Sequence, residues 1–180
     1  ISGYTIGDSD EPIQLLADVL TAIPGSLTVN IELKQPGCED LQFGAADTDD
    51  AREAAADRWR PFVDRVLDIA ADSEHDILYS SFYEGALAAA RDADSGLVLA
   101  PLVADSAATG LDLAGRYDAT AIHPSMDIVI GPEFVDTAHD AGYRVNAWTA
   151  TTAAEATALA TAGVDGIIAD TPAVVDTSMQ

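Results

Sequence analysis

Short apolar segments alternate with amphipathic segments along almost the whole chain. Residues 28–34, 76–82, 96–102, 119–124, 143–150 and 166–170 are short, apolar and rich in branched side chains, which predicts strands. Apolar residues recur at helical spacing in 12–23, 50–72, 84–93, 132–142 and 152–163. The segment from 103 to 115 has no clear pattern. A last helix is expected after Asp170 or Thr171, with Pro172 at its first position.

This alternation predicts an α/β fold with a parallel sheet, because each strand is followed by a helix long enough for a right-handed crossover. Two architectures compete: an open doubly wound sheet and a (β/α)8 TIM barrel. No glycine-rich phosphate turn follows any strand, which weakens the dinucleotide-binding form of the open sheet. Six strands are also fewer than a complete barrel requires.

The first strand combines an apolar face with a charged one. Alternation places Asn30, Glu32 and Lys34 on one face, opposite Val29, Ile31 and Leu33. Lys34 is the only lysine of the chain. A carboxylate and an ammonium are costly to bury without a partner, so the pair is either a solvated or structural ion pair or part of a ligand site.

The charge of the chain indicates its surroundings. Eight basic residues against thirty-one acidic ones give a formal net charge of −23, far beyond the magnitude of about 2 to 8 that keeps a small domain soluble. Such a surface suits high salt, where repulsion is screened. No basic stripe is present to bind nucleic acid or an anionic membrane. Because 48% of the residues are hydrophobic and the acids are dispersed, the chain is expected to be globular rather than an acidic tail.

The only cysteine, Cys38, can form no internal disulfide and has no zinc-ligand spacing around it. A reducing cytoplasm is the simplest inference. No apolar stretch approaches the roughly 20 residues of a membrane span, and residues 1–12 lack the features of a signal peptide.

Four segments resemble, in order and spacing, the C-terminal two-thirds of the glycerophosphodiester phosphodiesterase family. They are VNIELK (29–34), YSSF followed by a helix with an early leucine (79–82), AHDAGYRVNAWTAT (138–151) and AGVDGIIADTP (162–172). The lead-in EPIQLLADVLTAIPGSLT (11–28) also resembles the helix and turn before that family's Glu-x-Lys strand. No single segment is specific for this family, but the four segments in this order are fairly specific for it.

The resemblance implies a (β/α)8 barrel, represented here by six strands in a single domain over residues 1–180, with a divalent cation, Ca²⁺ or Mg²⁺, at the carboxyl ends of its strands. It implies hydrolysis of glycerophosphodiesters to glycerol phosphate and an alcohol. Glu32 corresponds to a metal ligand, and Lys34 to the residue that contacts the phosphate. Trp148 corresponds to a tryptophan lining the glycerol end of the pocket, and Phe82 would line the same cavity. Ordinary core packing is the alternative role for both aromatic residues.

Several family features are absent from this sequence. The two histidines that serve as general acid and base in the family have no counterpart, and its other metal carboxylates are also missing. No catalytic residue is therefore assigned, and these groups would lie upstream of Ile1. His75 precedes a strand and His139 lies within a helix, whereas His123 ends a strand and is expected to be a capping or surface residue. The threonine that precedes the final aspartate in the family is replaced by Ala169 in this sequence.

Two functional interpretations follow. The chain is either most of a metal-dependent phosphodiesterase, inactive by itself, or a non-catalytic truncated barrel that binds phosphate or acts as a scaffold. In both cases the unpaired outer strands predict an upstream partner strand or self-association. An unrelated open-sheet enzyme would be favoured if Glu32 and Trp148 lay at opposite ends of the sheet.

Overall fold

The computed structural model describes residues 5, 10–35, 41, 43–131 and 133–174. Six parallel strands form one sheet whose spatial order follows the sequence from β1 to β6. The strands are β1 (Val29–Glu32), β2 (Ile77–Ser81), β3 (Val98–Val103), β4 (Ala121–Pro124), β5 (Arg144–Ala150) and β6 (Gly166–Ala169). The helices are α1 (Leu16–Ala22), α2 (Asp49–Ala71), α3 (Glu84–Ala93), α4 (Ala107–Arg116), α5 (Met126–Val129), α6 (Phe134–Asp140) and α7 (Ala153–Thr161), followed by a 3-10 turn, η1 (Pro172–Val174).

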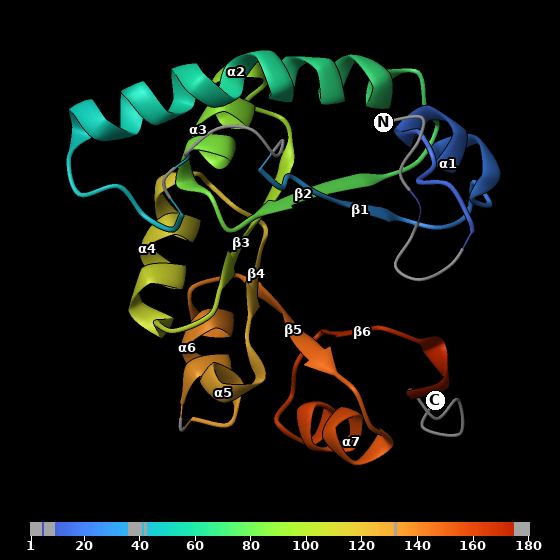
Figure 1. Cartoon of the computed structure of the whole chain (residues 1–180). Coiled ribbons are helices and arrows are strands. Elements are labelled where there is room, and N and C mark those ends of the chain that lie inside the picture. The colour runs from blue at the N-terminus through green and yellow to red at the C-terminus, as the bar shows by residue number, and fades with distance from the viewer. Residues whose placement is uncertain (1–4, 6–9, 36–40, 42, 132, 175–180) are drawn as a thin grey trace.

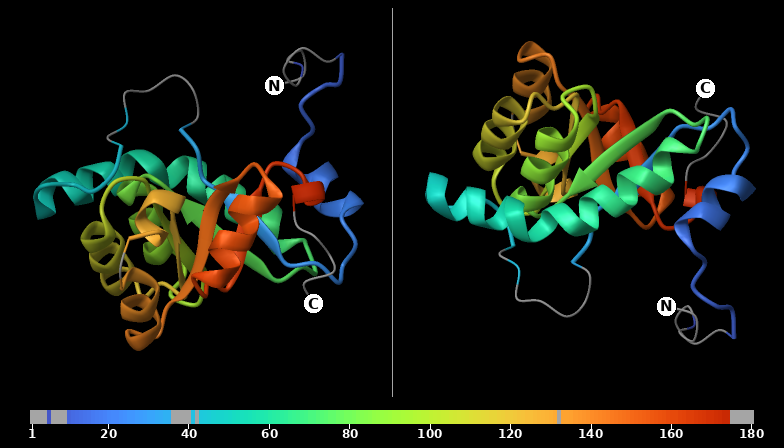
Figure 2. Two further views of the ribbon diagram at one scale, coloured as in Figure 1. Left: turned by 90° about the horizontal axis from the view of Figure 1, so that it is seen from below. Right: turned by 90° about the horizontal axis from the view of Figure 1, so that it is seen from above.

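The sheet is strongly curved, and the helices lie along its outer side (Figures 1 and 2). Phe82, directly after β2, contacts Trp148 of β5, although two strands separate β2 from β5 in the sheet. Side chains of non-adjacent strands meet in this way when a sheet curls around a common interior. The described strands therefore form an open, incomplete α/β barrel rather than a doubly wound sheet.

The longest helix, α2, is held against the barrel by an apolar stripe. Trp59, Val63, Val66 and Ala70 are buried along it at three- and four-residue steps. The helix crosses α3 so closely that a Cβ atom on Gly85 would lie 2.7 Å from Cδ1 of Trp59. Glycine at this position therefore sets the depth of the α2–α3 contact.

Several helical segments differ from the sequence-based predictions: α1 begins at Leu16, and α5 was not predicted. The unpatterned region contains α4, which begins after Ser106, whose hydroxyl accepts the Thr109 N–H. Its buried side is formed by Gly110, Leu113 and Ala114. The helix predicted over 132–142 is shorter, because Glu133 has a φ of 74° and α6 begins only after it. The last predicted helix is the single 3-10 turn η1.

Other predictions concern the outside of the molecule. Among the described residues, no helix is both long enough and apolar enough to cross a bilayer. The outer strands of the sheet are β1 and β6, and self-association through them stays a prediction. Cys38, on which the inference of a reducing compartment rests, lies outside the described residues.

The acidic surface leads to a salt prediction. We expect the thermal midpoint of unfolding to rise between about 0.1 M and multimolar potassium chloride, because the Debye length contracts from about 10 Å to below 3 Å and screens like charges. Thermal unfolding followed by circular dichroism measures this. Replacing four exposed acidic residues of α2 by their amides should weaken the dependence of the midpoint on salt. These residues are Asp50, Glu53, Asp64 and Asp68. A midpoint that stays level or falls with salt would contradict the high-salt interpretation.

Candidate functional site

Glu32 and Lys34 lie at the carboxyl end of β1. The predicted alternation is confirmed, since Ile31 and Leu33 are buried while the Glu32 and Lys34 side chains are 29% and 74% exposed. Lys34 Nζ lies 3.3 Å from Glu32 Oε2. A pair with one strongly exposed partner adds little stability. The pair is therefore not a major source of stability for the barrel.

Phe82 and Trp148 lie at the same end of the barrel as this ion pair. Glu32 is paired in register with Ser80, two residues before Phe82. The Phe82 and Trp148 rings meet edge to face, with centroids 5.4 Å apart. Glu32 and Trp148 thus do not lie at opposite ends of the sheet, which was the arrangement that would have favoured an unrelated open-sheet enzyme.

A third aromatic ring joins this pair. Phe43, in the segment between β1 and α2, stacks on Phe82 with centroids 5.3 Å apart and planes inclined by 21°. The sequence did not indicate this contact, because Phe43 lies in a polar segment far from Phe82 along the chain. Phe43, Phe82 and Trp148 form a row across the carboxyl ends of the strands, which we call the aromatic row.

His123 anchors the far end of the aromatic row. Its carbonyl oxygen accepts the Trp148 indole N–H at 2.8 Å, and its Nε2 lies 2.9 Å from the Asn146 amide nitrogen. The expectation that His123 is a capping or surface residue is wrong, because it is 2% exposed. Burial lowers its pKa to about 4, so the ring is neutral at pH 7. His123 Nδ1 and the Ser80 hydroxyl, both buried, have no partner among the described residues.

The near end of the aromatic row is anchored by Glu84, which the sequence analysis missed. Glu84 is 1% exposed, and its carboxylate accepts hydrogen bonds from Arg52 (2.7 Å), Arg116 (2.6 Å), the Tyr117 hydroxyl (2.8 Å) and the Ala46 N–H. Burial by itself would raise the pKa of Glu84, but these donors together lower it below its usual value. The carboxylate therefore stays charged and connects α2, α3, α4 and the segment that follows Phe43.

The described residues offer only part of a metal site. No group of three or more His, Cys, Asp or Glu side chains is gathered to hold a metal among them. Ca²⁺ and Mg²⁺ prefer six or more oxygen ligands, of which the Glu32 carboxylate can supply one. The Glu32 position thus fits a ligand of such an ion without forming a complete site.

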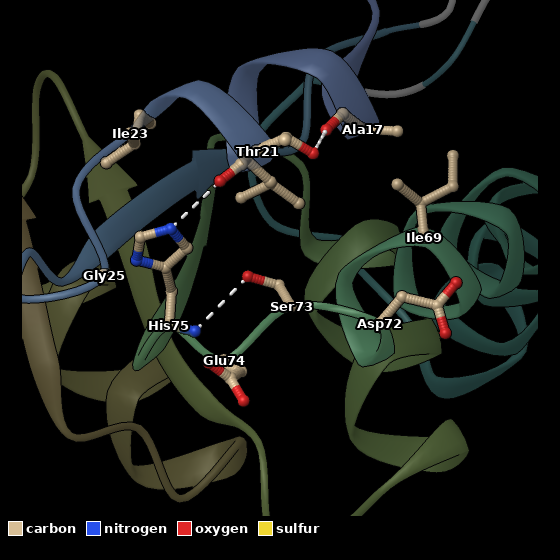
Figure 3. A pocket seen from close by; sticks show the side chains of 10 residues that line it. Ala17, Thr21, Ile23, Gly25, Ile69, Asp72, Ser73, Glu74 and His75 are labelled. Carbon is tan, nitrogen blue, oxygen red and sulfur yellow. Dashed lines mark hydrogen bonds between the residues drawn. The ribbon is translucent and has the colours of Figure 1, made fainter.

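The other two histidines lie away from this end of the barrel. His75 precedes β2, as predicted, and its ring nitrogens lie 2.9 Å and 3.1 Å from the carbonyl oxygens of Leu27 and Leu20. It lines a cavity of about 510 Å³ between α1 and the end of α2, near the amino ends of β1 and β2 (Figure 3). His139 lies on α6, with Nε2 2.8 Å from Asp165 Oδ2.

Several solved structures share this fold. A putative glycerophosphoryl diester phosphodiesterase from Silicibacter pomeroyi superposes with a TM-score of 0.67 at 23% identity, covering 87% of this chain and 52% of that chain. One from Galdieria sulphuraria gives a TM-score of 0.67 at 19% identity, covering 96% of this chain and 66% of that chain. An Oleispira antarctica phosphodiesterase in complex with the product sn-glycerol-3-phosphate gives 0.59 at 20% identity, covering 67% of this chain and 48% of that chain.

The chain thus spans about half to two-thirds of the length of these structures. No curated protein matched the chain in sequence. The glycerophosphoryl diester phosphodiesterase family model matches residues 9–174, nearly the whole chain. The ordered motifs, the curved parallel sheet and this match together show that the chain belongs to the glycerophosphoryl diester phosphodiesterase family.

Proposed function

We propose that this chain forms the phosphate-binding and glycerol-binding part of a metal-dependent enzyme that hydrolyses glycerophosphodiesters to glycerol phosphate and an alcohol. The observation that carries the proposal is the Glu32–Lys34 pair, which lies at the same end of the barrel as the Phe82–Trp148 contact. Family membership and the product-bound fold neighbour support it. In this reaction water adds to phosphorus, and the alcohol leaves with a proton.

Each residue has a distinct proposed role. The Lys34 ammonium would bind a phosphate oxygen and stabilise the negative charge that develops there. Glu32 would be one ligand of a divalent cation, Ca²⁺ or Mg²⁺, which when bound polarises the phosphate. Phe82 and Trp148 would pack against the apolar side of the glycerol, which leaves its hydroxyl groups free to bind water or protein.

The described histidines do not fit the roles of general acid and base. His75 is near the amino ends of the strands, His139 is on an outer helix, and His123 is buried and bonded to Asn146. Without a general acid the alcohol would leave as an alkoxide, which is a poor leaving group. We therefore propose that these groups come from outside the described residues, and that residues 1–180 alone bind glycerol phosphate without turnover. A cytoplasmic location and a single barrel domain are proposed with the same function.

Binding of sn-glycerol 3-phosphate tests the site without requiring turnover. Lys34→Ala should weaken binding about tenfold or more, because a charge-assisted hydrogen bond contributes about 1.5 to 3 kcal/mol. Isothermal titration calorimetry with and without Mg²⁺ or Ca²⁺ measures this affinity. Glu32→Gln should reduce the increase in affinity that the metal provides. Arg65→Ala, which removes an exposed cation from α2, is the matched control. Unchanged affinity in Lys34→Ala would exclude Lys34 from the site.

A further inference from the structure

Phe43 is a large apolar side chain that is exposed but held in place. Its side chain is 60% exposed, yet one ring face is stacked on Phe82, and the ring also meets Tyr83 edge to face with centroids 5.4 Å apart. Exposed aromatic residues that are fixed by their surroundings are typical of binding surfaces, since little conformational entropy is lost when a ligand binds.

The backbone around Phe43 explains why the ring is fixed. The Gly44 N–H donates to the Phe82 carbonyl at 3.0 Å, and the Glu84 N–H donates to the Gly44 carbonyl at 3.2 Å. Gly44 has a φ of 78°, a conformation that favours glycine. Two residues later the Ala46 N–H donates to the buried Glu84 carboxylate. Phe43 is therefore attached to the end of β2 and the start of α3, and Glu84 is its positioning residue.

Phe43 and Phe82 together form one wall of a recess of about 170 Å³. The recess lies between the carboxyl ends of β2 and β3 and the first turns of α4. Its other apolar walls are Leu102, Val103 and Leu113. Phe82 lines this recess and also contacts Trp148, so the recess adjoins the proposed glycerol site.

The chemistry of the lining selects an apolar occupant. The Ser106 hydroxyl already accepts the Thr109 N–H, and the Ala104 carbonyl accepts the Ser125 hydroxyl. The exposed carboxylate of Asp105 lies at the edge, where it would repel an anionic group. A hydrocarbon segment fills such a recess best, since each buried methylene contributes about 0.8 kcal/mol.

A phosphodiester has two ester arms that leave the phosphorus in different directions. With the phosphate on Lys34 and the glycerol arm on Trp148, the second arm can pass over Phe82 towards Phe43. We propose that this recess is the subsite for the leaving alcohol, that it takes a short alkyl chain, and that Phe43 is its specificity-determining residue. The inference rests on the proposed function and adds the substrate class to it.

A series of glycerophosphoalkyl diesters with methyl, propyl and pentyl groups tests the subsite by calorimetric binding, at a salt concentration at which the chain is folded. In the wild type, the affinity should rise about fourfold for each added methylene, which corresponds to about 0.8 kcal/mol. Phe43→Ala should abolish most of this dependence on chain length, and Phe43→Leu should retain part of it. Leu15→Ala, a truncation of another exposed apolar side chain before α1, should leave it unchanged.

Lys34→Ala separates this inference from the proposed function. If both hold, the variant binds all three diesters more weakly by the same factor but keeps the chain-length dependence. Equal affinities for the three diesters in the wild type, or an unchanged dependence in Phe43→Ala, would overturn the subsite while leaving the phosphate site intact. A chain-length dependence with no effect of Lys34→Ala would overturn the proposed function, and with it the assignment of the recess to a leaving alcohol.

Discussion

Replacing Glu84 by leucine is expected to lower the free energy of unfolding by about 3 kcal/mol or more, because removing one partner of a buried ion pair costs about 3 to 5 kcal/mol. Glu84 is 1% exposed and accepts hydrogen bonds from two guanidinium groups, a phenol and a backbone amide. The side chains of Arg52 and Arg116 are 21% and 32% exposed. Because they can regain some hydration, we expect the lower end of that range.

Urea unfolding at pH 7 and high salt measures this loss. Asp112→Asn is the matched control, because Asp112 pairs with the same Arg116 at 2.7 Å but its side chain is 59% exposed. A pair of that kind contributes at most about 1 kcal/mol. Glu84→Gln keeps the side-chain volume and one acceptor, so its loss should lie between those of Glu84→Leu and the control. If Glu84→Leu cost no more than the Asp112 variant, the cluster would not be a structural anchor.

The second large effect concerns acid pH. The folded pKa of His123, about 4, lies below the usual value of about 6.5, so the unfolded chain binds a proton more readily between these two pH values. The stability that depends on neutral His123 is therefore complete above about pH 6.5 and is lost as the pH falls towards 4. The full loss of unfolding free energy is about 3 kcal/mol, because the folded pKa of His123 is about 4 instead of 6.5 and a tenfold change in proton affinity corresponds to about 1.36 kcal/mol.

The measurement compares urea unfolding of the wild type and His123→Gln at several pH values between 7.5 and about 4.5. Titration of the many carboxylates affects both proteins, so the difference in their free energies of unfolding isolates His123. That difference should fall as the pH is lowered. His139→Gln, which changes a partly exposed ring on α6 that is paired with Asp165, should show no such fall. A difference that is constant with pH would refute the role of neutral, buried His123.

The amino-acid sequence by itself determined the order of elements and one charged face. All six predicted strands are present, because apolar composition and the length of a segment are local properties of the chain. Alternation along the first strand placed Glu32 and Lys34 together opposite Ile31 and Leu33. The alanine-rich helices α3 and α7 were predicted from sequence, whereas α4 was missed although its apolar residues recur at helical spacing.

Only the tertiary structure decided which distant residues meet. Curvature of the sheet brings Phe82 to Trp148 and buries His123. Packing of α2, α3 and α4 gathers Arg52 and Arg116 around Glu84. A glutamate at the start of the otherwise apolar helix EGALAAA was the available signal for that buried cluster, but its partners are 32 residues away in each direction. Local pattern specifies which face of an element is apolar, whereas the contacts across the barrel depend on how all six strands curve together, which no single segment encodes.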